Sequence, residues 1–200
     1  MISDLELLGS WSGEMQRHAY TALDAAESAM GALQGQASEL VAAFRATRET
    51  LRMQAQFEID ARTVVGRRAK KIYAPLNLFT RVRGGGLELS WQEVHRNRVT
   101  HRPAYKYLRL SADGNADLRL LLARALPFEL ELVRSTEERA KHLRSQWRRW
   151  VHLRDESVRA LHLAEELVFR TASTPSGPGG QGGQGGPQGG GLHDWIPAAP

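Results

Sequence analysis

Hydrophobic positions in the first third of the chain follow the spacing of an α-helix. Apolar side chains recur at alternating steps of three and four residues, with Thr47 at one intervening step: Met30, Leu33, Ala37, Leu40, Phe44 and Leu51. Such steps place the side chains on one face of a helix, as in the seam of a coiled coil. The pattern predicts a long helix over residues 13–60, weakened locally by Gly31 and Gly35.

In the middle of the chain the hydrophobic period changes to two. Residues 77–83 and 87–92 alternate between apolar and polar side chains, and Gly84, Gly85 and Gly86 separate the two runs. Alternation around a glycine turn predicts a β-hairpin. One face of its first strand carries Leu78, Thr80 and Val82, and the other carries Phe79, Arg81 and Arg83. Residues 104–110, AYKYLRL, predict a third strand.

Helical signals return after a turn at residues 113–114. Asn115 is the predicted cap of a short helix over residues 116–125, and Pro127 is expected to open the next helix. A long apolar stripe follows, at Leu130, Val133, Ala140, Leu143, Trp147, Trp150, Leu161 and Val168. We expect this helix to pack antiparallel to the helix of residues 13–60, so that each covers the stripe of the other.

The predicted fold class is α+β: two long antiparallel helices, a coiled-coil-like hairpin, with a small antiparallel sheet of about three strands inserted between them. Residues 1–170 form one domain, made of the helix 13–60, a basic β-hairpin region 62–110 and helices 115–170. Residues 171–200 are rich in glycine, proline and glutamine, which predicts a disordered tail. Within the tail, the apolar motif Leu192–Ile196 is either a docking peptide or a terminus without a role.

The composition removes several kinds of chemistry. The 200 residues contain no cysteine, which excludes disulfides, thiolate zinc sites and cysteine nucleophiles. Residues 1–14 carry no basic cluster, and no apolar run reaches the length that spans a membrane. We therefore expect a cytoplasmic protein that does not contact a membrane.

Positive charge is concentrated in residues 62–109, which contain twelve basic and two acidic residues, whereas the rest of the chain has more acidic than basic residues. Segregated positive charge attracts polyanions, although a basic surface also serves solubility alone. A two-stranded ribbon fits the DNA major groove, and basic side chains bind phosphates without reading sequence. The predicted residues for binding duplex DNA are Arg67, Arg68, Lys70, Lys71, Arg81, Arg83, Arg96, Arg98, Arg102, Lys106 and Arg109.

Other motifs give no signal of an active site. The run Gly84–Gly86 is followed by a strand rather than a helix, so it is a turn and not a phosphate-binding loop. The seven histidines lack the spacing of a metal site, and no serine-hydrolase elbow is present. We predict no metal and no cofactor. Glu88 is expected either to contact a cytosine or to pair with Arg81. The acidic residues of the last helix are interpreted as solvated: Glu129, Glu131, Glu137 and Glu138.

Tyr105 and Tyr107 leave a weaker alternative, a small enzyme that transfers DNA strands through a tyrosine nucleophile. Nearby basic residues would stabilise the phosphate in that reaction: Arg96, Arg98, His101 and Arg102. The favoured interpretation is that both tyrosines pack and stack on a strand.

The order of three segments resembles a known family. "GGGLELSWQEV", "RNRVTHRPAYKYLRL" and "PFELELVRSTEERAKHLR" together are similar to the MobI family of conjugative-transfer proteins of integrative conjugative elements and plasmids, over roughly residues 75–155. The resemblance implies an accessory factor that helps to initiate DNA transfer and is not itself the relaxase. The positions that carry it are Trp91, Tyr105 or Tyr107, Glu129, Leu132, Val133, Glu137 and Arg144.

The function expected from these observations is a non-enzymatic DNA-binding accessory factor at the origin of transfer of a mobile element. Its basic sheet would hold duplex DNA while the helical seam forms a homodimer or docks a relaxase or another transfer protein. The main alternative is a helical adaptor that binds another protein. The DNA sequence, the choice between DNA and RNA and the oligomeric state stay open.

Overall fold

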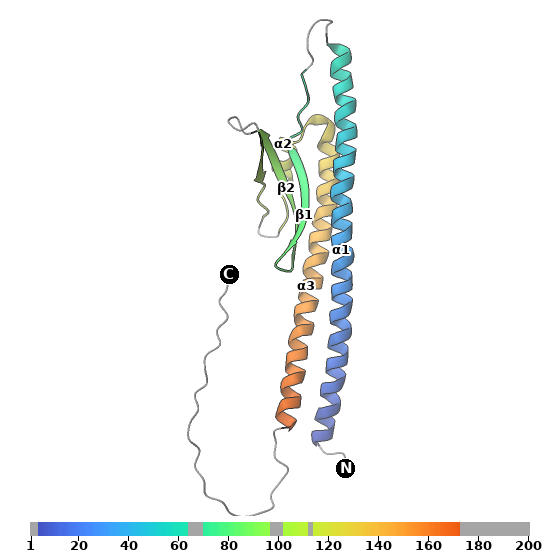
Figure 1. The fold of residues 1–200 in the computed structure, drawn as a ribbon, viewed down its shortest axis with the longest axis vertical. Coiled ribbons are helices and arrows are strands. Elements are labelled where there is room, and N and C mark those ends of the chain that lie inside the picture. Colours follow the sequence, from blue (N-terminus) through green and yellow to red (C-terminus); the bar gives the residue numbers. More distant parts are fainter. Residues whose placement is uncertain (1–3, 64–69, 97–101, 112–113, 173–200) are drawn as a thin grey trace, which may run out of the picture.

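The computed structural model describes residues 4–63, 70–96, 102–111 and 114–172. Along the chain the elements are α1 (Asp4–Arg62), β1 (Leu76–Arg83), β2 (Gly86–Arg96), β3 (Pro103–Tyr107), α2 (Leu118–Arg124), the 3-10 turn η1 (Pro127–Glu129) and α3 (Leu130–Ala172). The two long helices lie antiparallel beside each other, and the sheet packs beside part of their length (Figure 1). The first two residues of the predicted tail, Thr171 and Ala172, belong to α3. Residues 173–200 fall outside the described residues, as does the apolar motif Leu192–Ile196.

The helix α1 is one continuous helix of 59 residues and starts earlier than residue 13. The predicted seam is largely confirmed, because Met30, Leu33, Ala37, Leu40 and Phe44 are buried. Thr47 is exposed, and Val41 is buried although the pattern did not include it. Burial along the seam offsets the propensity cost of a helical glycine, which is about 1 kcal/mol.

Toward the N-terminus of α1 the buried positions change to small residues. Ser12, Ala19 and Ala26 are buried at intervals of seven residues, and Ser157 and Ala164 are buried on α3. This part of the helix pair extends past the hairpin (Figure 1). It therefore packs helix against helix with small side chains and without help from the sheet.

The predicted hairpin and third strand are confirmed as an antiparallel sheet of order β1-β2-β3, although the third strand covers Pro103–Tyr107 rather than residues 104–110. Arg83 pairs with Gly86, which leaves Gly84 and Gly85 as a two-residue loop. Both loop residues have positive φ, 55° and 74°. Two-residue hairpin loops favour this backbone conformation because it matches the twist of the flanking strands, and glycine adopts it without strain.

Replacing Gly85 with alanine is expected to lower the free energy of unfolding by about 1–2 kcal/mol, because alanine is strained at positive φ. A Cβ atom there would also lie 3.2 Å from a guanidinium nitrogen of Arg154. The matched control is Gly35→Ala, on an open face of α1 with no atom within 4 Å of the added methyl group. That change should raise stability by about 0.5–1 kcal/mol. Urea denaturation of both variants checks the pair, and equal effects would contradict the strain argument.

The prediction that the sheet is inserted between the two long helices is wrong. The sheet follows α1 in the chain and packs on one side of the α1–α3 pair (Figure 1). The reason is that the apolar stripes of both helices face each other: Leu40 and Phe44 of α1 and Ala140 and Leu143 of α3 belong to one buried cluster. Because the two helices cover each other's apolar stripe, the sheet can pack only on one side of the helix pair.

The connection between sheet and α3 corrects a second prediction. Asp117, not Asn115, caps α2, since its Oδ1 accepts hydrogen bonds from the backbone N–H groups of Arg119 and Leu120 at 2.9 and 3.3 Å. The Asn115 carbonyl oxygen instead accepts from the N–H of Ser111 at 2.8 Å, within a turn. The helix α2 is therefore shorter than the predicted 116–125. Within the described residues, no helix is both long and apolar enough to cross a membrane.

Candidate nucleic-acid interface

The two faces of the sheet differ in what they contact. On the inner face, Leu76 and Leu78 of β1 and Leu89 and Trp91 of β2 are all fully buried against the helices. The side chains that alternate with them point the other way, and apart from the buried Gln92 they are half-buried or exposed. The outer face is therefore the side of the sheet on which a ligand can be met.

Arginines from the helices seal the sheet edges beside the hairpin. Arg45 of α1 donates to the carbonyl oxygen of Leu78 at 3.3 Å, and Arg48 donates to that of Leu76. On the other side, Arg144 of α3 donates to the carbonyl oxygen of Leu89 at 2.8 Å. These bonds satisfy strand carbonyls that have no neighbouring strand, and they fix the orientation of the sheet on the helix pair.

A buried polar network joins β2 to α3. The indole N–H of Trp91 donates to Glu137 Oε2 at 2.7 Å. The other carboxylate oxygen of Glu137 accepts from Arg144 and, at 3.1 Å, from the backbone N–H of Ala116. The Trp91 ring also meets the edge of Phe44 at 5.0 Å between centroids, which adds α1 to the same contact. These contacts make Trp91 the point where the sheet is locked to both long helices.

The prediction that Glu129 and Glu137 are solvated is wrong, because both are buried. Glu129 Oε1 accepts from the N–H of Leu126 at 3.0 Å and closes η1, whereas its Oε2 finds no hydrogen-bond partner among the described residues. Burial raises the pKa of Glu129, and the nearby Leu126 N–H and Arg48 charge oppose the rise. Glu131 fits the prediction, since it is exposed and pairs with Arg134 at 3.4 Å.

Aromatic rings and an arginine meet on the outer face of the sheet. Phe79 of β1 and Tyr107 of β3 reach across the central strand, with ring centroids 5.2 Å apart at 74°. The guanidinium group of Arg81 lies 5.9 Å from the Phe79 centroid and also donates to Glu88 on β2. The pairing predicted for Glu88 and Arg81 is thus confirmed. The Tyr107 side chain remains open to solvent at 52% exposure, whereas Phe79 is half-buried.

Two more tyrosines, Tyr105 and Tyr73, lie near Val94 of β2. Tyr105, two residues before Tyr107, is 55% exposed and pairs with Val94 of β2. The Tyr73 hydroxyl donates to the carbonyl oxygen of Val94 at 2.7 Å. Burial of that hydroxyl, and then the neighbouring Tyr105, raise the pKa of Tyr73. Tyr73 is thus a neutral hydrogen-bond donor that ties the chain before β1 to the sheet.

Seven of the predicted DNA-binding side chains are described, and all are exposed: Lys70, Lys71, Arg81, Arg83, Arg102, Lys106 and Arg109. They lie on the sheet or on the segments that lead into and out of it. Arg67, Arg68 and Arg98 fall outside the described residues, and of Arg96 only the backbone at the end of β2 is described. The hairpin loop lies against Arg154 of α3, so the helix pair supports the hairpin up to its loop.

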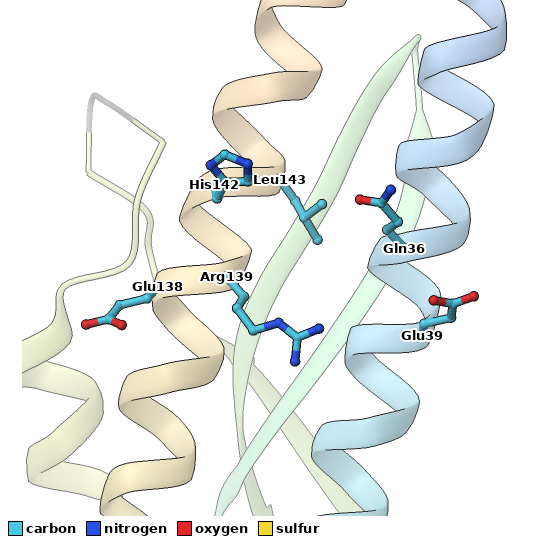
Figure 2. Close-up of a pocket in the computed structure, with 6 residues that line it drawn as sticks. All are labelled: Gln36, Glu39, Glu138, Arg139, His142 and Leu143. Carbon is cyan, nitrogen blue, oxygen red and sulfur yellow. The ribbon is translucent and has the colours of Figure 1, made fainter.

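The seam between the two long helices contains a hollow that is a second candidate site. Gln36 and Glu39 of α1 line it together with Glu138, Arg139, His142 and Leu143 of α3. Glu138 points away from the other side chains, and two of the residues are acidic (Figure 2). Mixed charge does not favour a polyanion, and no three potential metal ligands gather anywhere in the described part of the chain. The outer face of the sheet is therefore the better candidate site.

A sequence model of the MobI protein family matches residues 33–158. The chain belongs to the MobI family. The match covers the sheet, α2, η1, the second half of α1 and about the first two thirds of α3. No curated protein and no solved structure matches the chain.

The residues that carried the MobI resemblance fall into two groups. Trp91, Glu129, Val133, Glu137 and Arg144 are buried, and they hold the sheet and η1 on the helices. Leu132 belongs with this group, since it is partly buried and packs against the core. Tyr105 and Tyr107 are exposed on the outer face. The first group explains the fold of this MobI protein, whereas only the second is placed to meet a ligand.

Two features of the MobI chain were missed from the sequence. Phe79 was assigned only to a face, although it is the ring that Tyr107 and Arg81 contact. The alternation of Phe79 with the apolar Leu78 was the signal that could have marked Phe79 as a ring on the outer face. Arg45 and Arg48 were not singled out, because an arginine on a helix is usually solvated and no local pattern shows that a strand edge lies beside it.

Proposed function

We propose that this MobI-family protein is a non-enzymatic, DNA-binding accessory factor that acts at the origin of transfer of a mobile element. Membership of the MobI family supports a role in mobilisation. The observation that carries the DNA-binding part is the set of seven exposed basic side chains on and around a sheet that the helices hold rigidly. In this proposal their charges contact the phosphates of duplex DNA and give affinity without sequence.

The accessory role, rather than a catalytic one, is supported by the surroundings of Tyr107. Its ring packs on Phe79, and the tyrosine sits on a strand that is exposed along its whole length. A tyrosine nucleophile needs a site that holds the phosphate and excludes water, and β3 offers a flat surface. The proposed place of action is the cytoplasm, where the DNA of the element is found.

Binding of duplex DNA is expected to weaken steeply with salt. With about five phosphate contacts, the slope of log affinity against log salt should be roughly −4 to −5. Arg83→Gln should reduce the magnitude of the slope by about 1, because one contact is lost. Arg17→Gln is the control, since Arg17 is an exposed arginine of α1 in the part of the helix pair beyond the hairpin. Fluorescence anisotropy of a labelled duplex over a salt series measures both slopes.

A slope near zero, or no binding at low salt, would refute the DNA-binding proposal. The function then favoured is that of a helical adaptor. One observation supports it: Met53 and Phe57 are exposed on α1 around a shallow hollow that Gln54 and Glu58 complete. Exposed apolar side chains of this size mark protein-binding surfaces, such as one for a relaxase or a second copy of the chain.

A further inference from the structure

The outer face of the sheet has the chemistry of a surface that stacks bases. Phe79, Tyr105 and Tyr107 lie on this face, and none of the described helices covers it. Tyr105 and Tyr107 are two residues apart on one strand, so their rings are spaced by about 7 Å. Aromatic rings held on a sheet bind bases because every base has a π face, whatever its sequence.

Positive charge flanks these rings. Arg83 lies at the hairpin end of the outer face, and Arg102 immediately precedes β3 at the other end. Arg81 sits between them over the Phe79 ring. A strand of nucleic acid laid across the face would place its phosphates near basic side chains and its bases near the rings. The outer face therefore offers both positive charge for the phosphates and aromatic rings for the bases of one bound strand.

This combination favours unpaired bases over paired ones. In a duplex the faces of the bases are stacked on one another, so a protein reaches only their edges and the phosphates. Exposed ring planes add nothing to contacts of that kind. They contribute when bases are unstacked and free to lie on them.

We propose that the outer face of the sheet binds single-stranded DNA, with bases stacked on Tyr105, Tyr107 and Phe79 and phosphates held by Arg81 and Arg83. The proposal rests on the proposed function, since it specifies the form of DNA that the same basic sheet contacts. Duplex DNA is then bound by charge alone, and single-stranded DNA by charge and stacking together.

The test compares a labelled oligo-dT 20-mer, which forms no base pairs, with a duplex of the same length at equal salt. The wild-type protein should bind the single strand at least about tenfold more tightly, which corresponds to one stacked base. The double variant Tyr105→Leu, Tyr107→Leu keeps apolar side chains of similar size but removes two rings. It should lose about 10–100-fold in affinity for the single strand and less than twofold for the duplex.

Two further variants control for folding and for surface tyrosines in general. The double variant Tyr105→Phe, Tyr107→Phe retains both rings and should bind the single strand within about threefold of wild type. Tyr20→Ala removes an exposed tyrosine from the N-terminal part of α1, which extends past the hairpin (Figure 1), and should change nothing. Because every residue of β3 is exposed, the leucine variants are expected to fold. If circular dichroism shows that the leucine variant is unfolded, the test is decided by the wild-type protein alone. Its affinity for the single strand is then compared with its affinity for the duplex.

The outcomes separate the two proposals. If duplex binds with the expected salt slope but the single strand binds no more tightly, or if the leucine variants bind it normally, the stacking proposal is overturned and DNA binding stands. If neither DNA binds, the proposed function itself fails. If oligo-U binds more tightly than oligo-dT, the ligand is RNA, and the assignment to DNA is overturned.

Discussion

Replacing Glu137 with leucine is expected to lower the free energy of unfolding by about 3–5 kcal/mol, the range found when one partner of a buried ion pair is removed. The change leaves the guanidinium of Arg144 buried without its charge partner, and the side chains of this pair are only 5–6% exposed. It also removes the acceptor of the Trp91 indole N–H and of the Ala116 N–H. Urea denaturation followed by circular dichroism measures the loss.

The matched control is Glu138→Leu, which makes the same substitution at the next residue on the exposed side of α3. Its effect should stay within about 0.5 kcal/mol. The double variant Glu137→Leu, Arg144→Leu should recover part of the loss, because no buried charge then remains unpaired. A single variant that loses under 1 kcal/mol would mean that the network does not hold the sheet on α3.

Trp91→Ala should have an effect of similar size, a loss of about 3–5 kcal/mol. Trp91 is fully buried, and its removal leaves a cavity between β2, Phe44 and Glu137 that the helices cannot close without moving. Trp11→Ala offers a control of the same residue type, since Trp11 on α1 is 75% exposed. That variant should unfold within about 0.5 kcal/mol of wild type. Equal losses from the two tryptophans would show that Trp91 has no special place in the core.

These core variants also bear on how a MobI protein is tested for function. A loss of DNA binding in Glu137→Leu or Trp91→Ala would reflect a displaced sheet rather than a lost contact. The exposed residues Arg83, Tyr105 and Tyr107 are free of this difficulty, since none of them is buried in the core. Measurements of stability and of binding on the same variants therefore separate the two groups of residues.

The regular elements were predictable from the sequence because their signals are local. The steps of three and four before Phe44 and the alternation around Gly84 and Gly85 each reflect the geometry of one helix or one hairpin. The exposed basic side chains followed from composition for a similar reason, since charged groups stay in water unless paired. The face assignment of Phe79 and Arg81 also followed directly from alternation.

The predictions that failed depend on contacts between distant segments. Glu137 has the spacing of an ordinary helical surface residue, and only the arrival of Trp91 and Arg144 at the same place buries it. The predicted position of the sheet between the two long helices was wrong for the same reason. Two apolar stripes in a sequence do not specify whether the helices face each other or both face a third layer. Asn115 and Asp117 are both good caps by type, and the turn that engages the Asn115 carbonyl decided between them.

The protected strand edges also reduce the tendency of the sheet to pair with a strand of another molecule. An extended segment joins a sheet through the main-chain groups of an edge strand, and exposed edges are a common route to aggregation. At β1 that route is closed where Arg45 and Arg48 occupy the carbonyl oxygens of Leu78 and Leu76. The opposite edge strand, β3, has only five residues, among them a proline without an N–H group and a lysine. A sheet protected in this way can stay open to a ligand on its outer face at high local concentration without the copies polymerising strand to strand.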